Sequence, residues 1–349
     1  MMITAGNGFI EQSDRYAFNN AGESLKKYIL LERGELAYNH GASKLRPYGS
    51  CFALTTVEKA RIPFVYHCFS VEKSNPEFLS IELNGANVEN QLRKIVSSGA
   101  RMDGLLNIAY SEYTEVTVQL PKKEEQDWIA KFFKHLDTLI TLHQRKYEKL
   151  VNIKKSMLDK MFPKNGASVP EIRFKGFTDP WEQRKLEEYL EVSGQKNFEG
   201  IYTKEDVLSV SGDFGIVNQI EFQGRSFAGA SVANYGVVET GDIVYTKSPL
   251  KSNPYGIIKA NKGKNGIVST LYAVYKPKQS ANPEFVQIYF EQDARMNNYM
   301  HPLVNKGAKN DMKVSAENAL KGQIVFPDIK EQRTISEFFH NLDTLITLH

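Results

Sequence analysis

Residues 132–143 read FFKHLDTLITLH and residues 338–349 read FFHNLDTLITLH, so ten of the twelve positions are identical. The two stretches lie 206 residues apart in a chain of 349 residues. A repeat separated by this distance indicates a duplicated domain, because the units of solenoid proteins are only roughly 20 to 50 residues long. The sequence therefore predicts two related halves, and each half is expected to end in the same helix.

The match continues upstream of these stretches. Asn-Pro-Glu-Phe occurs at residues 75–78 and 282–285, and Gly-Ala-Arg at 99–101 aligns with Gly-Ala-Lys at 307–309. Small insertions explain why the offset drifts between 206 and 208 residues. The other matched positions are Gly34, Tyr38, Lys44, Pro47, Tyr48, Gly49, Pro121, Glu125 and Gln126 with Gly241, Tyr245, Lys251, Pro254, Tyr255, Gly256, Pro327, Glu331 and Gln332.

Composition predicts an ordinary soluble protein, since 41% of the residues are hydrophobic and 24% are charged. The length gives room for two cores. The two cysteines, Cys51 and Cys68, are too few for a disulfide scaffold and lack metal-ligand spacing, so we expect buried thiols and a cytoplasmic location. No apolar run of about 18 residues and no signal peptide is visible, which argues against a membrane protein or a secreted one.

Charge is distributed unevenly along the chain. The net charge is only +3, but residues 243–283 contain seven lysines and no aspartate or glutamate. A local positive field of this kind suits the phosphate backbone of nucleic acid. A solvated loop surface explains the charge equally well. The corresponding stretch of the first half is weaker, because Lys44, Arg46, Lys59 and Arg61 are accompanied by Glu58.

Apolar residues at helical spacing predict one long helix between residues 124 and 162. Pro121 precedes it, Glu124 and Glu125 favour its positive N-terminal end, and Pro163 ends it. At 1.5 Å per residue this helix is roughly 58 Å long, and a helix of that length usually packs against another one. Its apolar positions include Ile129, Tyr147, Val151, Met157, Leu158 and Met161.

Glycine and proline residues divide the rest of the chain. Residues 164–180 are predicted to be a linker, and a second globular domain begins near Trp181. Strands are expected at residues 241–246, 266–275 and 320–327, and Asn282-Pro283-Glu284 is a typical helix start. The predicted segments are a first domain at 1–121, a long helix at 122–163, a linker at 164–180, a second domain at 181–328 and a second helix at 329–349.

No catalytic pattern stands out in the sequence. Asn-Pro-Glu-Phe differs from the Asn/Asp-Pro-Pro-aromatic motif of amino methyltransferases at its third position, and a helix cap is the favoured interpretation. The seven histidines are scattered, and no zinc pattern, phosphate-binding loop or nucleophile elbow is present. We therefore expect a protein that is not an enzyme.

Several motifs resemble those of a known family. They are GDIVYTKS at residues 241–248, Pro-x-x-x-Glu-Gln at 121–126 and 327–332, FFKHLDTLITLHQRKYEKLVNIKKSMLDKMFP at 132–163, and PEIRFKGFTDPWEQRKL at 170–186. Together with the order of domain, helix, linker, domain and helix, they cover most of the chain. In these features the chain is similar to the specificity subunit of type I restriction-modification enzymes, which serve in bacterial defence.

The resemblance implies an α+β fold with two target recognition domains, separated by long amphipathic helices that pair as an antiparallel coiled coil. Each domain then reads one half of a split sequence in double-stranded DNA, while the helices set the spacing and dock methyltransferase (modification) subunits. It also implies that motor-nuclease (restriction) subunits join the complex. S-adenosylmethionine, ATP and Mg²⁺ are expected only on those partners, so this chain is expected to hold no cofactor and no metal.

The resemblance also directs attention to basic loop residues as DNA contacts. Arg101 has the side chain to grip a guanine edge, whereas isolated lysines more often hold phosphates. Positions matched between the halves are better suited to the framework or the DNA backbone, and Tyr48 and Tyr255 are equally suited to packing. The predicted DNA-binding residues are Lys44, Arg46, Arg101, Lys247, Lys251, Lys259, Lys262, Lys264, Lys306 and Lys309.

The predicted helix-pairing surface, shared with partner subunits, follows the apolar stripes of both helices. When the halves are aligned, Met1 lies opposite about Leu208, and the second helix ends at the equivalent of His143. We therefore expect that elements are missing from the start of the first domain and from the end of the second helix. An exposed strand edge in the first domain and uncovered apolar surface on Tyr147, Leu150 and Leu158 would follow. The stripe residues are Phe132, Phe133, Leu136, Leu139, Ile140, Leu150, Phe338, Phe339, Leu342, Leu345 and Ile346.

Three other functions stay open on the sequence alone. One is a truncated fragment with partial or no function, and another is an adaptor that binds proteins through its coiled coil. A stand-alone methyltransferase would need to bind S-adenosylmethionine, for which the sequence has no motif. Salt-dependent DNA binding separates a DNA-recognition subunit from an adaptor.

Overall fold

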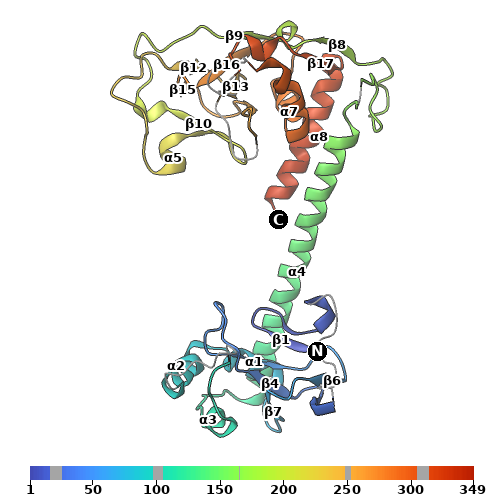
Figure 1. Cartoon of the computed structure of the whole chain (residues 1–349), viewed down its shortest axis with the longest axis vertical. Coiled ribbons are helices and arrows are strands. Elements are labelled where there is room, and N and C mark those ends of the chain that lie inside the picture. Colours follow the sequence, from blue (N-terminus) through green and yellow to red (C-terminus); the bar gives the residue numbers. More distant parts are fainter. Residues whose placement is uncertain (16–25, 97–104, 165, 248–252, 305–313) are drawn as a thin grey trace. The chain divides into compact units, whose positions relative to one another are not determined.

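The computed structural model of the chain describes residues 1–15, 26–96, 105–164, 166–247, 253–304 and 314–349 (Figure 1). The chain forms two compact units, which we call unit 1 (Met1–Leu142) and unit 2 (His143–His349). Each unit combines short antiparallel strands with helices, so the predicted α+β class is confirmed. The long helix α4, Lys123–Lys160, contributes its first part to unit 1 and its second part to unit 2.

Unit 1 contains seven described strands, and their pairing is entirely antiparallel. A hairpin, a strand pair and a three-stranded sheet in the order β5-β4-β7 make up its β structure. The elements are β1 (Met2–Thr4), β2 (Gly8–Ile10), η1 (Gln12–Asp14), β3 (Ile29–Glu32), β4 (Leu36–Asn39), β5 (Ser50–Ala53), β6 (Lys59–Ile62), β7 (His67–Phe69), α1 (Pro76–Glu82), α2 (Ala86–Ile95), α3 (Tyr110–Thr114) and the first part of α4.

Unit 2 is larger and is built around a four-stranded sheet in the order β14-β13-β16-β9. Its strands are β8 (Glu182–Lys185), β9 (Leu190–Val192), β10 (Leu208–Ser211), β11 (Gly215–Asn218), β12 (Gly236–Val238), β13 (Ile243–Thr246), β14 (Ile258–Ala260), β15 (Gly266–Val268), β16 (Tyr272–Pro277) and β17 (Gln323–Phe326). Its helices are η3 (Leu186–Glu188), η4 (Lys204–Asp206), α5 (Gln219–Gln223), α6 (Pro283–Tyr289), α7 (Asp293–Met300), η5 (His301–Leu303), η6 (Asn318–Leu320) and α8 (Ile329–Thr347).

Each strand of unit 1 has a counterpart in unit 2. The pairs β1-β2 and β3-β6 correspond to β10-β11 and β12-β15, and β5-β4-β7 corresponds to β14-β13-β16. Leu36 pairs with Ala53, and Ile243 pairs with Ala260, so both central strands keep the same register at an offset of 207 residues. The sequence repeat is therefore a repeat of the fold.

A tight turn after the central strand explains why Pro-Tyr-Gly occurs in both halves. The hydroxyl of Tyr38 donates to the carbonyl of Tyr48 at 2.5 Å, and that of Tyr245 donates to the carbonyl of Tyr255 at 2.7 Å. The glycine that follows has φ of 86° at Gly49 and 83° at Gly256. A Cβ at Gly49 would lie 2.6 Å from the carbonyl oxygen of Asn39, so only glycine fits this turn.

A buried glutamine at the start of each long helix joins three elements. Gln126 accepts the backbone N–H of Asn75 at 2.9 Å and donates to the carbonyl of Pro121 at 2.8 Å. Gln332 accepts the N–H of Asn282 at 2.9 Å and donates to the carbonyl of Pro327 at 2.9 Å. We call these sets of contacts the glutamine clamps.

The asparagine of each clamp is also a helix cap. The side chain of Asn75 accepts the N–H of Phe78 at 3.0 Å, and that of Asn282 accepts the N–H of Phe285 at 2.9 Å. Proline occupies the first helical turn in both cases. The prediction that Asn-Pro-Glu-Phe starts a helix is confirmed.

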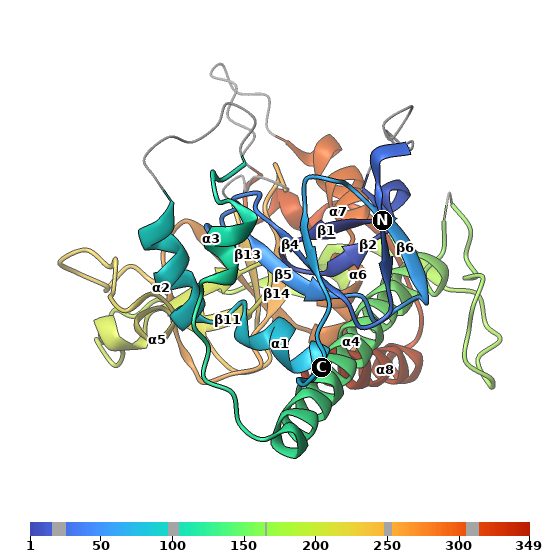
Figure 2. The same cartoon turned by 90° about the horizontal axis from the view of Figure 1, so that it is seen from below.

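Within unit 2, the second part of α4 packs antiparallel to α8, and Figures 1 and 2 show the two helices side by side. Lys154 forms ion pairs of 2.7 Å with both Asp343 of α8 and Glu291. Phe162, just after α4, packs against Phe339 with ring centroids 6.3 Å apart. At the other end of the pair, the Nδ1 atoms of His143 and His349 are 3.0 Å apart. The predicted antiparallel pairing of amphipathic helices is confirmed.

The expectation that Leu158 is uncovered was wrong. Leu158 is buried in the main core of unit 2, which it shares with Phe162, Phe339 and Ile335. Its neighbour Leu150 is half-buried, and Tyr147 is exposed. The described part of α8 is long enough to cover the end of α4, because antiparallel pairing brings the start of α8 to that end.

Among the described residues, the sheet of unit 1 that contains β4 has one strand fewer than the corresponding sheet of unit 2. In unit 2, β16 is flanked on both sides by β13 and β9. Its counterpart β7 pairs only with β4 among the described residues. Unit 2 also pairs β17 with β8, whereas the described residues of unit 1 contain no strand that corresponds to β8.

We predict that Gln332→Leu destabilises the protein by about 1 to 3 kcal/mol, because the buried N–H of Asn282 and the carbonyl of Pro327 both lose their partner. Urea unfolding followed by circular dichroism measures this loss. Gln144→Leu is the matched control, since Gln144 lies on an exposed part of α4 and donates to Glu148. Equal stability of the two variants would contradict the role of the clamp.

Candidate nucleic-acid interface

The lysine-rich stretch of unit 2, residues 243–283, has a weaker local positive charge in the folded chain than its sequence suggests. Nζ of Lys276 lies 2.6 Å from Oε2 of Glu239 and 2.9 Å from Oδ2 of Asp242. Nζ of Lys262 lies 3.6 Å from Oε1 of Glu284. These carboxylates flank residues 243–283 in the sequence, and folding places them next to lysines of that stretch. Fewer of its charges are therefore available to an anionic ligand.

Two other lysines of unit 2 approach each other without such compensation. Lys247 follows β13, is half-buried, and donates from Nζ to the carbonyl of Thr270 at 2.9 Å. Lys196 is exposed and bridges the backbone of Gly236 in β12. Burial lowers the pKa of Lys247, and the charge of Lys196 lowers it further, whereas Glu317 opposes the shift.

The positive charge of Lys196 thus disfavours the charged form of Lys247, and an anion that contacted both lysines would relieve this repulsion. Within the described residues, neither lysine forms an ion pair. We call Lys196 and Lys247 the lysine pair. Lys247 was predicted from the sequence, but Lys196 was missed. A backbone bridge in the folded chain places Lys196 beside Gly236 of β12, 40 residues away in the sequence.

Two predicted contacts, Lys44 and Lys264, are exposed on loops. Lys44 lies between β4 and β5, and Lys264 lies between β14 and β15. The loop around Lys264 is ordered by the side chain of Asn261, which donates to the carbonyl of Lys264 at 3.1 Å. Both lysines therefore have an ammonium group that is accessible to a phosphate.

Arg46 and Lys259 are less accessible than the sequence suggests. Nη1 of Arg46 donates to the carbonyl of Asn84 at 2.6 Å and ties the β4–β5 loop to the end of α1. Lys259, in β14, is only 8% exposed, and burial lowers its pKa. These positions leave little surface for a phosphate contact. Four other predicted contacts, Arg101, Lys251, Lys306 and Lys309, lie outside the described residues and stay predictions.

The predicted helix-pairing residues fall into two groups. On α8, Phe339 and Leu342 are buried, Phe338 and Ile346 are half-buried and Leu345 is exposed. On α4, Leu150 is half-buried within unit 2. The stripe of unit 1 is exposed at each of its five positions, which are Phe132, Phe133, Leu136, Leu139 and Ile140.

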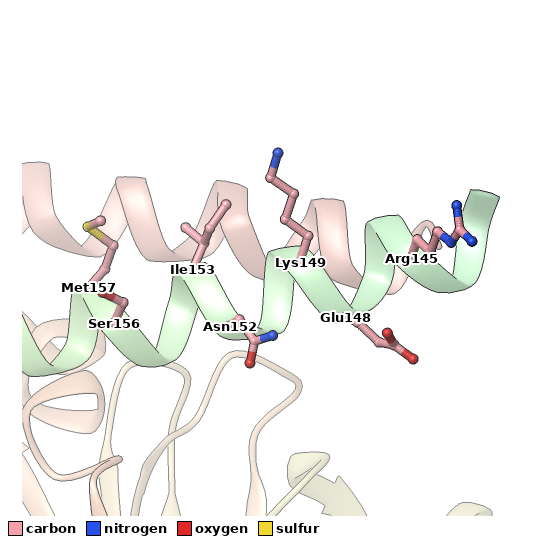
Figure 3. Close-up of a pocket in the computed structure, with 7 residues that line it drawn as sticks. All are labelled: Arg145, Glu148, Lys149, Asn152, Ile153, Ser156 and Met157. Carbon is pink, nitrogen blue, oxygen red and sulfur yellow. The ribbon is translucent and has the colours of Figure 1, made fainter. Parts of the chain in front are cut away.

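The second part of α4 also bears a shallow hollow of about 480 Å³. All of its lining side chains project from this one helix, as Figure 3 shows. A hollow without a second wall does not bury a small molecule, because ligand sites are concave and enclose most of their ligand. The lining residues are Arg145, Glu148, Lys149, Asn152, Ile153, Ser156 and Met157.

Neither cysteine supplies a reactive thiolate. Burial raises the pKa of the Cys51 thiol to about 12 and that of Cys68 to about 11, so both stay protonated and unreactive at neutral pH. The prediction of a buried thiol is confirmed for Cys51, whereas Cys68 is half-buried. In the described part of the chain, no group of three or more metal-ligating side chains is found, and no helix there is apolar and long enough to cross a bilayer.

The chain was compared with known proteins. No protein-family model matches the sequence, and no curated protein is similar to it. The HsdS subunit from Thermoanaerobacter tengcongensis is 15% identical, with 91% of this chain and 75% of that chain aligned and a TM-score of 0.46. The type I restriction-modification S subunit from M. genitalium is 13% identical, with 93% and 79% aligned and a TM-score of 0.46.

A third solved structure concerns complex assembly and conformational transition of the type I restriction-modification system. It is 16% identical, with 91% of this chain and 76% of that chain aligned, and has a TM-score of 0.45. Over at least 91% of its length, this chain is thus similar to solved structures from type I restriction-modification systems, two of which are specificity subunits.

Proposed function

We propose that this chain is the DNA-recognition subunit of a type I restriction-modification complex. In this proposal each unit reads one half of a bipartite target in double-stranded DNA, and the paired helices set the spacing and dock methyltransferase subunits. Motor-nuclease subunits complete the complex. S-adenosylmethionine, ATP and Mg²⁺ belong to these partners, and the complex works in the cytoplasm. The chain itself binds DNA and catalyses nothing.

The observation that carries this proposal is that the two units share one framework but differ in the side chains on their loops. The turn at Gly49 and Gly256 and the clamps at Gln126 and Gln332 are the same in both units. Exposed and half-buried loop positions differ between them. A protein that reads two unlike half-sites needs this combination, because the shared framework fixes each unit while the variable side chains read the bases.

The side chains at equivalent positions illustrate the difference. Lys247 of the lysine pair corresponds to His40, which is buried in unit 1. Lys262 corresponds to Thr55, and Phe214, at the exposed tip of the β10–β11 hairpin, corresponds to Asn7. At these three positions unit 2 has two lysines and a phenylalanine where unit 1 has a histidine, a threonine and an asparagine, so we propose that unit 2 contacts the DNA backbone more strongly there.

The lysine pair is the phosphate contact that we expect to matter most in unit 2. We predict that Lys196→Ala combined with Lys247→Ala weakens binding to duplex DNA and lowers the slope of log affinity against log salt by about two, since two phosphate contacts are lost. Fluorescence anisotropy in a salt series measures both quantities. Lys330→Ala, an exposed lysine at the start of α8, is the control and leaves the slope unchanged. Affinity that does not respond to salt in the unaltered chain would favour a protein-binding adaptor instead.

A second prediction concerns the target. When the chain is expressed with its methyltransferase partners, the mapping of methylated adenines should reveal one sequence motif with two specified halves and an unspecified spacer. Exchange of the β10–β11 hairpin for that of another specificity subunit should alter one half and leave the other half and the spacer unchanged. Methylation at an undivided motif would contradict the assignment of one half-site to each unit.

A further inference from the structure

Lys259 of β14 is a buried lysine at a position where unit 1 has Phe52. The two residues pair with equivalent positions of the central strands β13 and β4. Side chains alternate along a strand, and Ile258 and Ala260 both belong to the main core of unit 2. The side chain of Lys259 therefore leaves the sheet on the face opposite to that core.

The β10–β11 hairpin packs on this opposite face of the sheet. Lys259 lines a hollow of about 590 Å³ together with Asp213 in the turn of the hairpin and Ile216 in β11. In unit 1 the same packing is apolar, because a Cβ at Gly8 of β2 would lie 3.2 Å from Cδ1 of Phe52. The residue at this position thus supports the hairpin of each unit.

The long helices line the same hollow. Lys154 of α4, Glu291 after α6 and Asp343 of α8 all contribute to it. Nζ of Lys154 lies 2.7 Å from a carboxylate oxygen of each of the two acids. Two carboxylates share one ammonium group, so this group of three carries one excess negative charge. A second cation in the hollow balances that charge, and Lys259 supplies it.

Several charged groups act on the ammonium group of Lys259. Burial lowers its pKa, and the charge of Lys154 lowers it further. Glu291, Asp213 and Asp343 oppose this shift. In the described part of the chain Lys259 forms no ion pair with any of them, so these attractions act across the hollow. Salt screens them less than it screens charges on the surface, because the lysine is buried.

The internal repeat shows that these charges occur as a set. Three of them are present in unit 2 and replaced by uncharged residues in unit 1. The equivalents are Phe52 for Lys259, Gly6 for Asp213 and Asn84 for Glu291. Asp343 keeps its carboxylate as Asp137, which is exposed. Unit 1 therefore lacks the lysine and also lacks the carboxylate in the turn of its hairpin, which indicates that the two groups act together.

We propose that Lys259 is a positioning residue, which attracts Asp213 and so holds the β10–β11 hairpin in the orientation that reads one half of the DNA target. The same ammonium group is attracted to the carboxylates beside α4 and α8, so it joins the hairpin to these helices. Lys259 itself is too buried to contact DNA. This inference rests on the proposed function, because it assigns the orientation of the hairpin to that function.

Hydrogen exchange of the hairpin amides, measured by mass spectrometry, tests the positioning in the absence of DNA. Lys259→Met keeps an apolar stem and removes the charge, so residues 208–218 should exchange about threefold faster or more. Asp213→Asn should have the same effect, and the double variant should not exceed either single one, because both substitutions remove one interaction. Lys259→Arg keeps the charge and should keep exchange slow. Lys330→Met, which removes an exposed charge at the start of α8, is the control and should change nothing.

The mapping of methylated adenines with the methyltransferase partners tests the consequence for DNA reading. Lys259→Met should relax the base preference in the half of the target that exchange of the hairpin alters. The other half and the spacer should stay unchanged, and Lys259→Arg should keep the preference. Circular dichroism establishes that each variant is folded.

Three results would each overturn the proposal. They are unchanged exchange in Lys259→Met, additive effects of Lys259→Met and Asp213→Asn, and an unchanged half-site in a variant whose hairpin exchanges faster. Failure of the proposed function is a separate result, because the unaltered chain would then give no bipartite motif while the exchange of the hairpin amides would still respond to the substitutions.

Discussion

The arrangement of each unit depends on one buried glutamine side chain. Gln126 and Gln332 each accept the N–H of an asparagine cap and donate to the carbonyl of the proline before the long helix. Two pieces of chain, 51 residues apart in unit 1 and 50 residues apart in unit 2, are thereby fixed at one point. Because the amide is buried, an unsatisfied partner at this point would cost more than an exposed hydrogen bond contributes. The start of α4 is thus held to unit 1, and the start of α8 is held to unit 2.

The second constraint is the pairing of the long helices within unit 2. Their apolar faces supply much of the main core, and Lys154 adds a partly buried bridge to two carboxylates. A lysine in this position would be costly without both partners, because burial disfavours its charged form. The bridge therefore favours one register of the two helices over neighbouring ones. The apolar contacts supply most of the attraction, and the charges supply the selectivity.

Much of the framework was predictable from the sequence because its residues act locally. Local interactions determine each of these features. They are the helix start at Asn-Pro, the turn at a glycine with positive φ after tyrosine, and the helix formed by apolar residues at helical spacing. The duplication added to this information, because a residue that is identical in both halves indicates a requirement of the fold. The helix start at Asn282 was predicted from its local pattern, and Gly256 was marked only as a position matched to Gly49.

The surface was harder to predict because it depends on contacts between distant residues. The lysines between residues 243 and 283 seemed uncompensated, but Glu239, Asp242 and Glu284 neutralise part of their charge in the fold. Lys259 is buried, as are both of its neighbours in β14, which a count of charges does not show. Lys196 lies beside Gly236 of β12 through a backbone bridge between residues that are distant in the sequence. Likewise, the burial of Leu158 followed from the direction of helix pairing and was invisible in either helix alone.

Each glutamine clamp is closed within its own unit, since all of its partners belong to the same half of the chain. All four of these partners are backbone groups, which are present whatever the side chain. Substitutions that accumulate on the loops of one unit thus leave the framework of the other untouched. In evolutionary terms the two halves are free to diverge at separate rates, and a lineage can acquire a new surface on one of them while the inherited surface of the other persists.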